Sequence, residues 1–127
     1  MFEGPQIRAI AADFFDVTPT ETGPVDLVFD RAALVALPPD MRARYVQHVL
    51  RFLDPGARML LVAFEYDASK MDGPPFSVDE TEVRSHYERA GTLERVARRD
   101  ILDEEPRFRD RGLDYLFETV WNFARTT

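Results

Sequence analysis

Short apolar runs, separated by polar segments rich in proline or glycine, make up most of the chain. Residues 7–15 (IRAIAADFF) and 25–30 (VDLVFD) have the length and composition of strands, and Gly23 and Pro24 precede the second one. Residues 57–67 (ARMLLVAFEYD) are apolar at nearly every position, which is typical of a strand covered on both faces. The pattern therefore predicts three strands within the first 67 residues.

Two segments have the periodicity of amphipathic helices. The first follows Pro38 and Pro39, because proline is tolerated in the first turn of a helix. Its apolar stripe consists of Met41, Tyr45, Val46, Val49, Leu50, Phe52 and Leu53. We expect the opposite, polar face to be exposed: Arg42, Arg44, His48 and Arg51. A second helix is predicted over residues 78–89, where Ser77 and Glu80 have capping-box spacing.

Two more strands are predicted in the last third of the chain. They cover residues 92–102 (TLERVARRDIL) and 112–124 (GLDYLFETVWNFA). Strands that alternate with helices indicate an α/β fold with a mainly parallel sheet. The sequence has neither repeats nor a second apolar unit, so we interpret residues 1–127 as a single domain.

Composition narrows the class of protein. A hydrophobic share of 45% and a charged share of 31% are those of an ordinary soluble domain. The net charge of −7 disfavours nucleic acid and anionic membranes as partners, because their phosphates repel an acidic chain. With no cysteine and two histidines, disulfides, thiol catalysis and a histidine-rich metal site are excluded, and we expect no metal.

The beginning of the chain, MFEGPQIR, is too polar for a signal peptide. No apolar run in the sequence is long enough to span a bilayer. We therefore expect a cytoplasmic location.

Polar residues directly after the predicted strands are the first candidates for a site, since open α/β sheets bind ligands beyond the carboxyl ends of their strands. Asp13 could accept a hydrogen bond from an exocyclic amine while Phe14 packs on a heterocycle, or the pair could simply begin an acidic loop. Arg31 could be a fixed cation in the crevice, or the partner of Asp30 in a surface ion pair.

The segment Gly73–Phe76 (GPPF) could form a rigid apolar lip of a pocket, or only a stiff loop. The charged run 103–112 (DEEPRFRDRG) is typical of a solvated loop. No nucleophile-elbow, zinc-protease or phosphate-loop motif occurs in the sequence, and no glycine-rich phosphate loop is found.

Four blocks of the sequence together resemble the C-terminal part of the thiopurine S-methyltransferase family: AADFFDVTP, DLVFDRAALVALPPDMRARYVQHV, YDASKMDGPPFSVDETEV and DILDEEPRFRDRGLDYLFE. The resemblance extends over nearly the whole chain. It implies a Rossmann-like, class I S-adenosylmethionine-dependent methyltransferase fold. It also implies methyl transfer from S-adenosyl-L-methionine to an aromatic or heterocyclic thiol such as a thiopurine, with selenium and tellurium oxyanions as further acceptors in bacterial relatives.

The resemblance also implies roles for single residues. Asp13 and Phe14 match positions at the adenine end of the cofactor, and Arg31 matches an arginine beside both cofactor and acceptor, where it would favour the acceptor thiolate. Four residues match the acceptor pocket, Arg107 with a looser alignment than the others: Pro74, Pro75, Phe76 and Arg107.

The first two strands of the family, with their glycine-containing turn and ribose-binding acidic residue, have no counterpart in this sequence. We therefore expect an N-terminally truncated fold, a partial methyltransferase domain in which strand 7–15 leaves the sheet, moves beside strand 25–30, or pairs with another copy. Three interpretations follow: part of a thiol methyltransferase, an inactive remnant that binds a small ligand, or an interaction module that forms a homodimer through an exposed strand edge.

Overall fold

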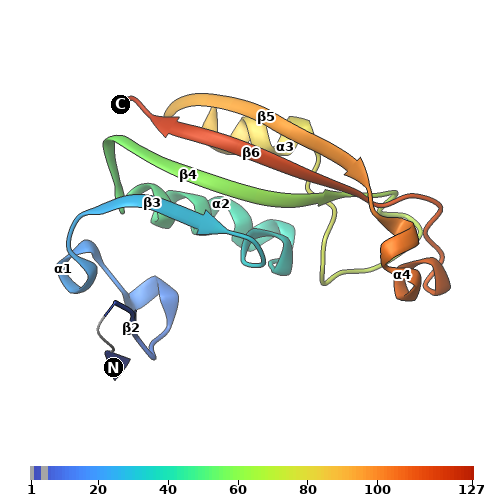
Figure 1. Ribbon diagram of the computed structural model, residues 1–127, viewed down its shortest axis with the longest axis horizontal. Helices are drawn as coiled ribbons and strands as arrows, with labels where there is room; N and C mark the ends of the chain where they lie inside the picture. The colour runs from blue at the N-terminus through green and yellow to red at the C-terminus, as the bar shows by residue number, and fades with distance from the viewer. Residues whose placement is uncertain (1, 4–5) are drawn as a thin grey trace.

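A four-stranded sheet in the order β3-β4-β6-β5 organises the computed structural model, which describes residues 2–3 and 6–127 (Figure 1). Its strands are β3 (Val25–Asp30), β4 (Leu53–Glu65), β5 (Gly91–Asp100) and β6 (Phe117–Arg125). β3 runs parallel to β4, whereas β6 runs antiparallel to both β4 and β5. The predicted strand at 25–30 is confirmed with the same ends, and those at 57–67, 92–102 and 112–124 are confirmed with shifted ends.

The prediction of a mainly parallel sheet is wrong, and the connections explain why. Between β5 and β6 the longest helix is α4 (Pro106–Asp110), of five residues. A helix of that length spans roughly 8 Å, too little to carry the chain back along a strand of roughly 30 Å. β6 therefore returns antiparallel and inserts between β4 and β5.

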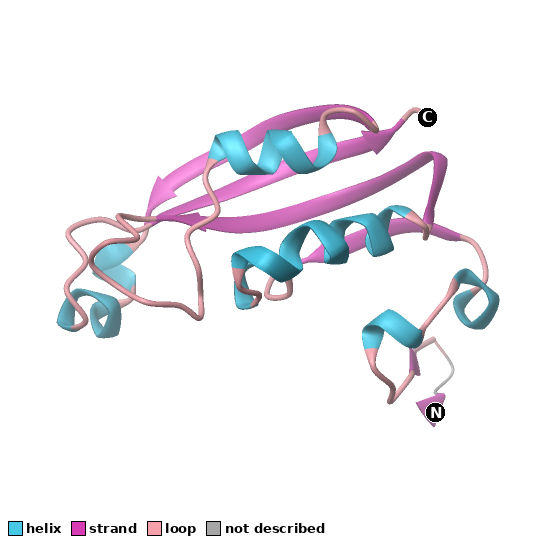
Figure 2. Cartoon of the chain, turned by 180° about the vertical axis from the view of Figure 1, so that it is seen from behind, coloured by secondary structure: helices cyan, strands magenta, loops and turns pink. Residues whose placement is uncertain are grey.

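Both longer helices cover the same face of the sheet, as Figure 2 shows. They are α2 (Pro39–Leu50) and α3 (Glu80–Tyr87), and both predicted helices are confirmed. The assignment of Phe52 and Leu53 to the first helix is wrong, because α2 ends at Leu50 and Leu53 already begins β4. The cap of α3 differs from the prediction: Asp79, not Ser77, accepts the hydrogen bond from the Glu82 amide. The remaining elements are short: β1 (Phe2–Glu3), β2 (Arg8–Ala9), α1 (Pro19–Thr22) and the 3₁₀ helices η1 (Phe14–Asp16), η2 (Leu34–Ala36) and η3 (Leu102–Glu104).

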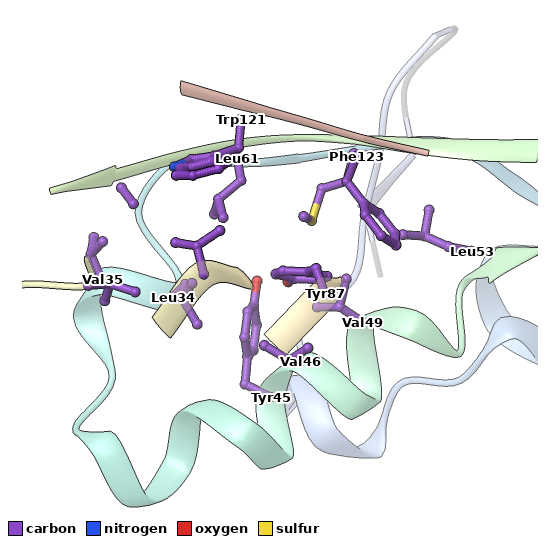
Figure 3. Close-up of a cluster of buried hydrophobic side chains, with 14 of the residues drawn as sticks. Leu34, Val35, Tyr45, Val46, Val49, Leu53, Leu61, Tyr87, Trp121 and Phe123 are labelled. Carbon is purple, nitrogen blue, oxygen red and sulfur yellow. The ribbon is translucent and has the colours of Figure 1, made fainter. Parts of the chain in front are cut away.

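The main core lies between this face of the sheet and the two helices (Figure 3). Trp121 and Phe123 point into it from β6, Leu61 from β4, and Tyr45 and Tyr87 from the helices. A smaller cluster lies beyond the end of the sheet at which β4 and β5 finish and β6 begins. It is formed by Tyr66, Met71, Ile101, Leu102, Phe108, Leu113 and Leu116.

The opposite face of the sheet has no helix over it in the part of the chain that the structure describes. Met59, Leu61 and Ala63 of β4 point to the core, whereas Leu60 between them is 36% exposed. The prediction that β4 is covered on both faces is therefore wrong at Leu60. Other large apolar side chains are exposed on the strands as well: Leu27, Phe29 and Val96.

The predicted strand over residues 7–15 is wrong. Within residues 7–15, only Arg8–Ala9 forms a strand, which pairs antiparallel with Phe2–Glu3. This two-stranded sheet is separate from the main sheet. Further along, the Asp13 side chain accepts a hydrogen bond from the Phe15 amide and caps η1, so residues 14 and 15 are helical and not extended. Residues 1, 4 and 5, which belong to the segment expected not to be a signal peptide, lie outside the described residues.

Two residues on the polar face of α2 are buried, contrary to expectation. His48 is covered by the N-terminal segment: its Nε2 lies 2.8 Å from the Val17 carbonyl oxygen, and its ring lies 4.8 Å from that of Phe14. Arg42 is covered by the loop that contains Phe76. Segments distant in the sequence therefore bury side chains that the helical pattern alone assigns to solvent.

No helix among the described residues combines the length and apolarity needed to cross a bilayer. Within the same residues, no three histidine or acidic side chains come together as metal ligands.

Candidate functional site

The carboxyl end of β3 is fixed by Asp30, which is 3% exposed. One carboxylate oxygen accepts hydrogen bonds from the amides of Ala33 and Leu34, at 3.2 and 3.3 Å. The other accepts a hydrogen bond of 2.7 Å from the hydroxyl of Tyr45 on α2. Burial raises the pKa of the Tyr45 phenol far above its usual value, and the charge of Asp30 raises that pKa further. The Tyr45 hydroxyl therefore remains a hydrogen-bond donor at any ordinary pH.

Arg31 is left free by this arrangement. Because Asp30 bonds to Tyr45 and to the turn, it forms no ion pair with Arg31, and the surface-pair alternative does not hold in this structure. The Arg31 side chain is exposed and has no hydrogen bond or ion pair with any residue that the structure describes.

Arg31 instead borders a hollow of about 400 Å³ beyond the carboxyl ends of β3 and β4, which we call the Arg31 crevice. Its lining consists of Arg31, Ala32, Val35, Ala36, Phe64, Pro74, Pro75, Glu105 and Arg107. A volume in this range accommodates a small ring compound. Three of the four residues assigned to the acceptor pocket by resemblance, Pro74, Pro75 and Arg107, lie here together with Arg31.

The loop that carries Pro74 and Pro75 is fastened to the sheet and to η2. The Phe76 amide donates a hydrogen bond of 2.7 Å to the Val35 carbonyl, and the Tyr66 hydroxyl donates one of 2.6 Å to the Pro75 carbonyl. The peptide bonds that precede Pro74 and Pro75 are both cis. The hydrogen bonds to the Val35 and Pro75 carbonyls hold this loop, in which the two prolines form an apolar wall of the crevice.

Phe76 faces the other way. It borders a separate hollow behind the loop, where the guanidinium of Arg42 lies 5.4 Å from the centre of its ring. Arg42 also donates to the Leu37 carbonyl at 3.0 Å and to Glu82 at 2.5 Å. In the structure, Phe76 therefore supports the loop and does not line the Arg31 crevice.

Glu82 joins α3 to this support. Burial acts to raise the pKa of its carboxyl group, but hydrogen bonds from His86 and Arg42 outweigh burial and hold that pKa below its usual value. The Glu82 carboxylate is therefore charged at neutral pH and fixes Arg42 beneath the loop.

Arg107 reaches the crevice from α4. Its Nε lies 3.3 Å from a carboxylate oxygen of Glu105, and its guanidinium lies 4.7 Å from the centre of the Phe108 ring. The charge pattern predicts a solvated loop for Glu105, whereas this residue lines the crevice. No local signal distinguishes it within the run DEEPRFRDRG, because its place depends on the distant loops around it.

Asp13 and Phe14 lie at the other end of the sheet. The Phe14 ring packs near His48 and Phe52, at the end of α2 where β4 begins, whereas Arg31 follows the last residue of β3. Phe14 borders a mostly apolar hollow of about 250 Å³ along β3, and Asp13 caps η1. The structure does not bring these two residues together with Arg31.

Solved structures with a similar fold include several methyltransferases. The N-methyltransferase NodS from Bradyrhizobium japonicum, in complex with S-adenosyl-L-homocysteine, matches 93% of this chain and 54% of its own, with a TM-score of 0.60 and 17% identity. The 1,6-didemethyltoxoflavin-N1-methyltransferase of Burkholderia thailandensis matches 93% of this chain and 50% of its own, with a TM-score of 0.54 and 20% identity. The expected Rossmann-like methyltransferase fold is thus confirmed.

Relatives in sequence are closer. The thiopurine S-methyltransferase of Bordetella petrii is 43% identical over 124 residues, covering 98% of this chain and 57% of that protein. That of Nitrosospira multiformis is 42% identical over 115 residues, covering 91% of this chain and 52% of that protein. This chain spans about half the length of these relatives. The model of the thiopurine S-methyltransferase family matches residues 2–126, and the chain belongs to that family.

Proposed function

We propose that this chain carries the acceptor side of a methyltransferase that transfers a methyl group from S-adenosyl-L-methionine to the sulfur of an aromatic or heterocyclic thiol. The observation behind the proposal is the Arg31 crevice, in which an unpaired guanidinium faces a wall formed by Pro74 and Pro75. Family membership supports methyl transfer as the reaction and a thiopurine-like thiol as the acceptor.

The crevice suits an aromatic thiolate for two reasons. Val35, Phe64 and the two prolines offer apolar surface to the ring of the acceptor. The guanidinium of Arg31 would stabilise the thiolate over the thiol, so that the acceptor releases its proton to solvent before methyl transfer. The sulfur–carbon bond then forms on the acceptor as the donor's bond breaks, and positioning supplies most of the acceleration.

S-adenosyl-L-methionine is the proposed donor, because it provides an electrophilic methyl group. The solved structure of NodS contains the corresponding product, S-adenosyl-L-homocysteine. Asp13 and Phe14 lie away from the Arg31 crevice, so we assign no catalytic step to them, and their place at the adenine end of the cofactor stays a prediction.

Two titrations of the chain test the proposal. We expect 4-nitrobenzenethiolate to bind and to change its absorbance, and Arg31→Ala to weaken this binding by at least tenfold while Arg31→Lys retains part of it. Arg44→Ala is the matched control, since Arg44 is exposed and packs on Phe15 away from the crevice. Equal binding by Arg31→Ala and the control would remove Arg31 from the site.

Calorimetric titration with S-adenosyl-L-homocysteine distinguishes a methyltransferase from an inactive remnant that binds a small ligand. Micromolar binding, with loss of thiolate absorbance on addition of S-adenosyl-L-methionine, supports the enzyme. If the thiolate binds but S-adenosyl-L-homocysteine does not, the chain is a remnant that binds a small ligand, and catalysis by this chain is contradicted.

We also propose that two copies pair through the free edge of β3. Leu27 and Phe29 of this edge strand are 61% and 64% exposed and point to the uncovered face of the sheet. Light scattering after gel filtration should give the mass of a dimer for the chain and of a monomer for Phe29→Lys. A monomer for both proteins contradicts the pairing.

Residues 1–127 then form a single partial methyltransferase domain that would act in the cytoplasm on a small molecule. The net charge of −7 supports the expectation that neither nucleic acid nor an anionic membrane is a partner. One cooperative unfolding transition, seen alike by circular dichroism and tryptophan fluorescence, is the expected sign of a single domain.

A further inference from the structure

We propose that Glu105 limits the Arg31 crevice to ligands that carry a single negative charge. The lining holds two arginines and one glutamate, so its charged side chains leave one net positive charge to offer a ligand. This inference rests on the proposed function only in that the same crevice binds the acceptor.

The two arginines differ in what they offer. Arg31 has no partner among the described residues, whereas Arg107 already faces the carboxylate of Glu105 at 3.3 Å. A monoanion can take Arg31 and leave the Arg107–Glu105 pair intact. A second negative charge has to approach Arg107, and there it meets the Glu105 carboxylate.

The backbone that carries Glu105 is anchored on both sides. Its amide donates to the carbonyl of Leu102 at 3.1 Å, and its carbonyl accepts from the Phe108 amide at 3.0 Å. Leu102 and Phe108 are both buried in the smaller apolar cluster, and Pro106 restricts the backbone between them. The side chain of Glu105 is 37% exposed, against 72% for Arg107, so the carboxylate is the less solvated partner of the pair.

The crevice is small enough for this charge to act on any ligand inside it. A sphere of 400 Å³ is about 9 Å across, similar to the screening length of about 8 Å at physiological ionic strength. The repulsion energy grows with the ligand's charge. Removing the carboxylate should therefore increase the affinity for a dianion by the square of the factor by which it increases the affinity for a monoanion.

The test uses benzoate and phthalate, which share one ring and carry one and two negative charges at pH 7.5. Dissociation constants are measured on the full chain by NMR, from the backbone amides and the arginine Nε signals, for the wild type and Glu105→Gln. We expect the variant to bind benzoate about threefold more tightly and phthalate about tenfold more tightly than the wild type does.

Glu104→Gln is the matched control, because it removes the same charge one residue away. Glu104 is paired with Arg99 at 2.7 Å and does not line the crevice, so both affinities should stay within twofold of wild type. Circular dichroism confirms that both variants are folded.

Equal gains for the two ligands in Glu105→Gln, an equal gain in Glu104→Gln, or no binding of either ligand to any of the proteins overturns the inference. The ratio of the two affinities does not depend on S-adenosyl-L-homocysteine. Failure of the cofactor titration therefore counts against the proposed transferase and leaves the role of Glu105 to be decided by this ratio.

Discussion

Two buried tyrosines in the same core provide a direct test of the hydrogen bond that holds the end of β3. Tyr45 and Tyr87 lie side by side in Figure 3, from α2 and α3 respectively. The Tyr45 hydroxyl donates to the buried carboxylate of Asp30 at 2.7 Å. The Tyr87 hydroxyl is buried and has no hydrogen-bond partner in the part of the chain that the structure describes.

Replacing each tyrosine with phenylalanine keeps the ring and removes only the hydroxyl. A hydrogen bond to a charged group contributes about 1.5–3 kcal/mol, so Tyr45→Phe should lower the free energy of unfolding by about 2 kcal/mol. A buried hydroxyl without a partner contributes nothing and costs its desolvation, so Tyr87→Phe should leave stability unchanged or raise it by up to about 1 kcal/mol.

Urea denaturation at pH 7 and 25 °C, followed by the fluorescence of Trp121, measures both differences. Equal destabilisation by the two substitutions would show that the ring environment, not the bond to Asp30, sets the cost. No destabilisation by Tyr45→Phe would contradict the bond itself. Tyr45→Phe should also weaken thiolate binding in the crevice, because Arg31 follows Asp30 directly.

Three further substitutions test other parts of the structure. Leu61→Ala, in the core, should cost about 3 kcal/mol in urea denaturation, whereas Leu60→Ala on the uncovered face should cost less than about 1 kcal/mol; equal costs would mean that both faces are covered. Gly91→Ala places a methyl carbon 2.0 Å from the Ala124 carbonyl oxygen and should cost about 3 kcal/mol, with Thr92→Ala as an exposed control; retention of wild-type stability refutes this close approach. Because the pKa of Glu82 lies below its usual 4.5, its contribution is present above pH 4.5 and is lost as pH falls through the folded value; Glu82→Gln should thus be less stable at pH 7, on the order of 1 kcal/mol, and converge with wild type toward pH 3 in melts, whereas a pH-independent difference contradicts the role of its charge.

The parts of the fold that could be predicted are those that one segment specifies by itself. Val25–Asp30 is a short apolar run that follows Gly23 and Pro24, and α2 carries an apolar stripe after two prolines, so both elements are predictable from their own residues, although the end of α2 is not. The antiparallel entry of β6 between β4 and β5 depends on the short span of the connection before it. Periodicity within a strand carries no information about its direction.

The site shows the same division. The sequence places Arg31 after a strand and the resemblance assigns the prolines and Arg107, and the structure gathers these residues around one hollow. The bond from Asp30 to Tyr45 joins residues 15 positions apart on two elements, and no pattern along the chain reveals it. Arg42 and His48 were assigned to solvent because a helical pattern records one face against another, not the loops that later cover it.

Because β3 is hydrogen-bonded to the main sheet only through β4, it can open locally while the β4-β6-β5 ladders stay closed. Such an opening takes Arg31 away from Pro74 and Pro75, so the apparent affinity of the crevice is reduced by the fraction of molecules in which β3 is docked. By linkage, a ligand in the crevice must in turn slow hydrogen exchange at the β3 amides more than at those of β6. Docking of β3 on β4 and binding of a ligand in the Arg31 crevice are therefore coupled, and a change in one changes the other.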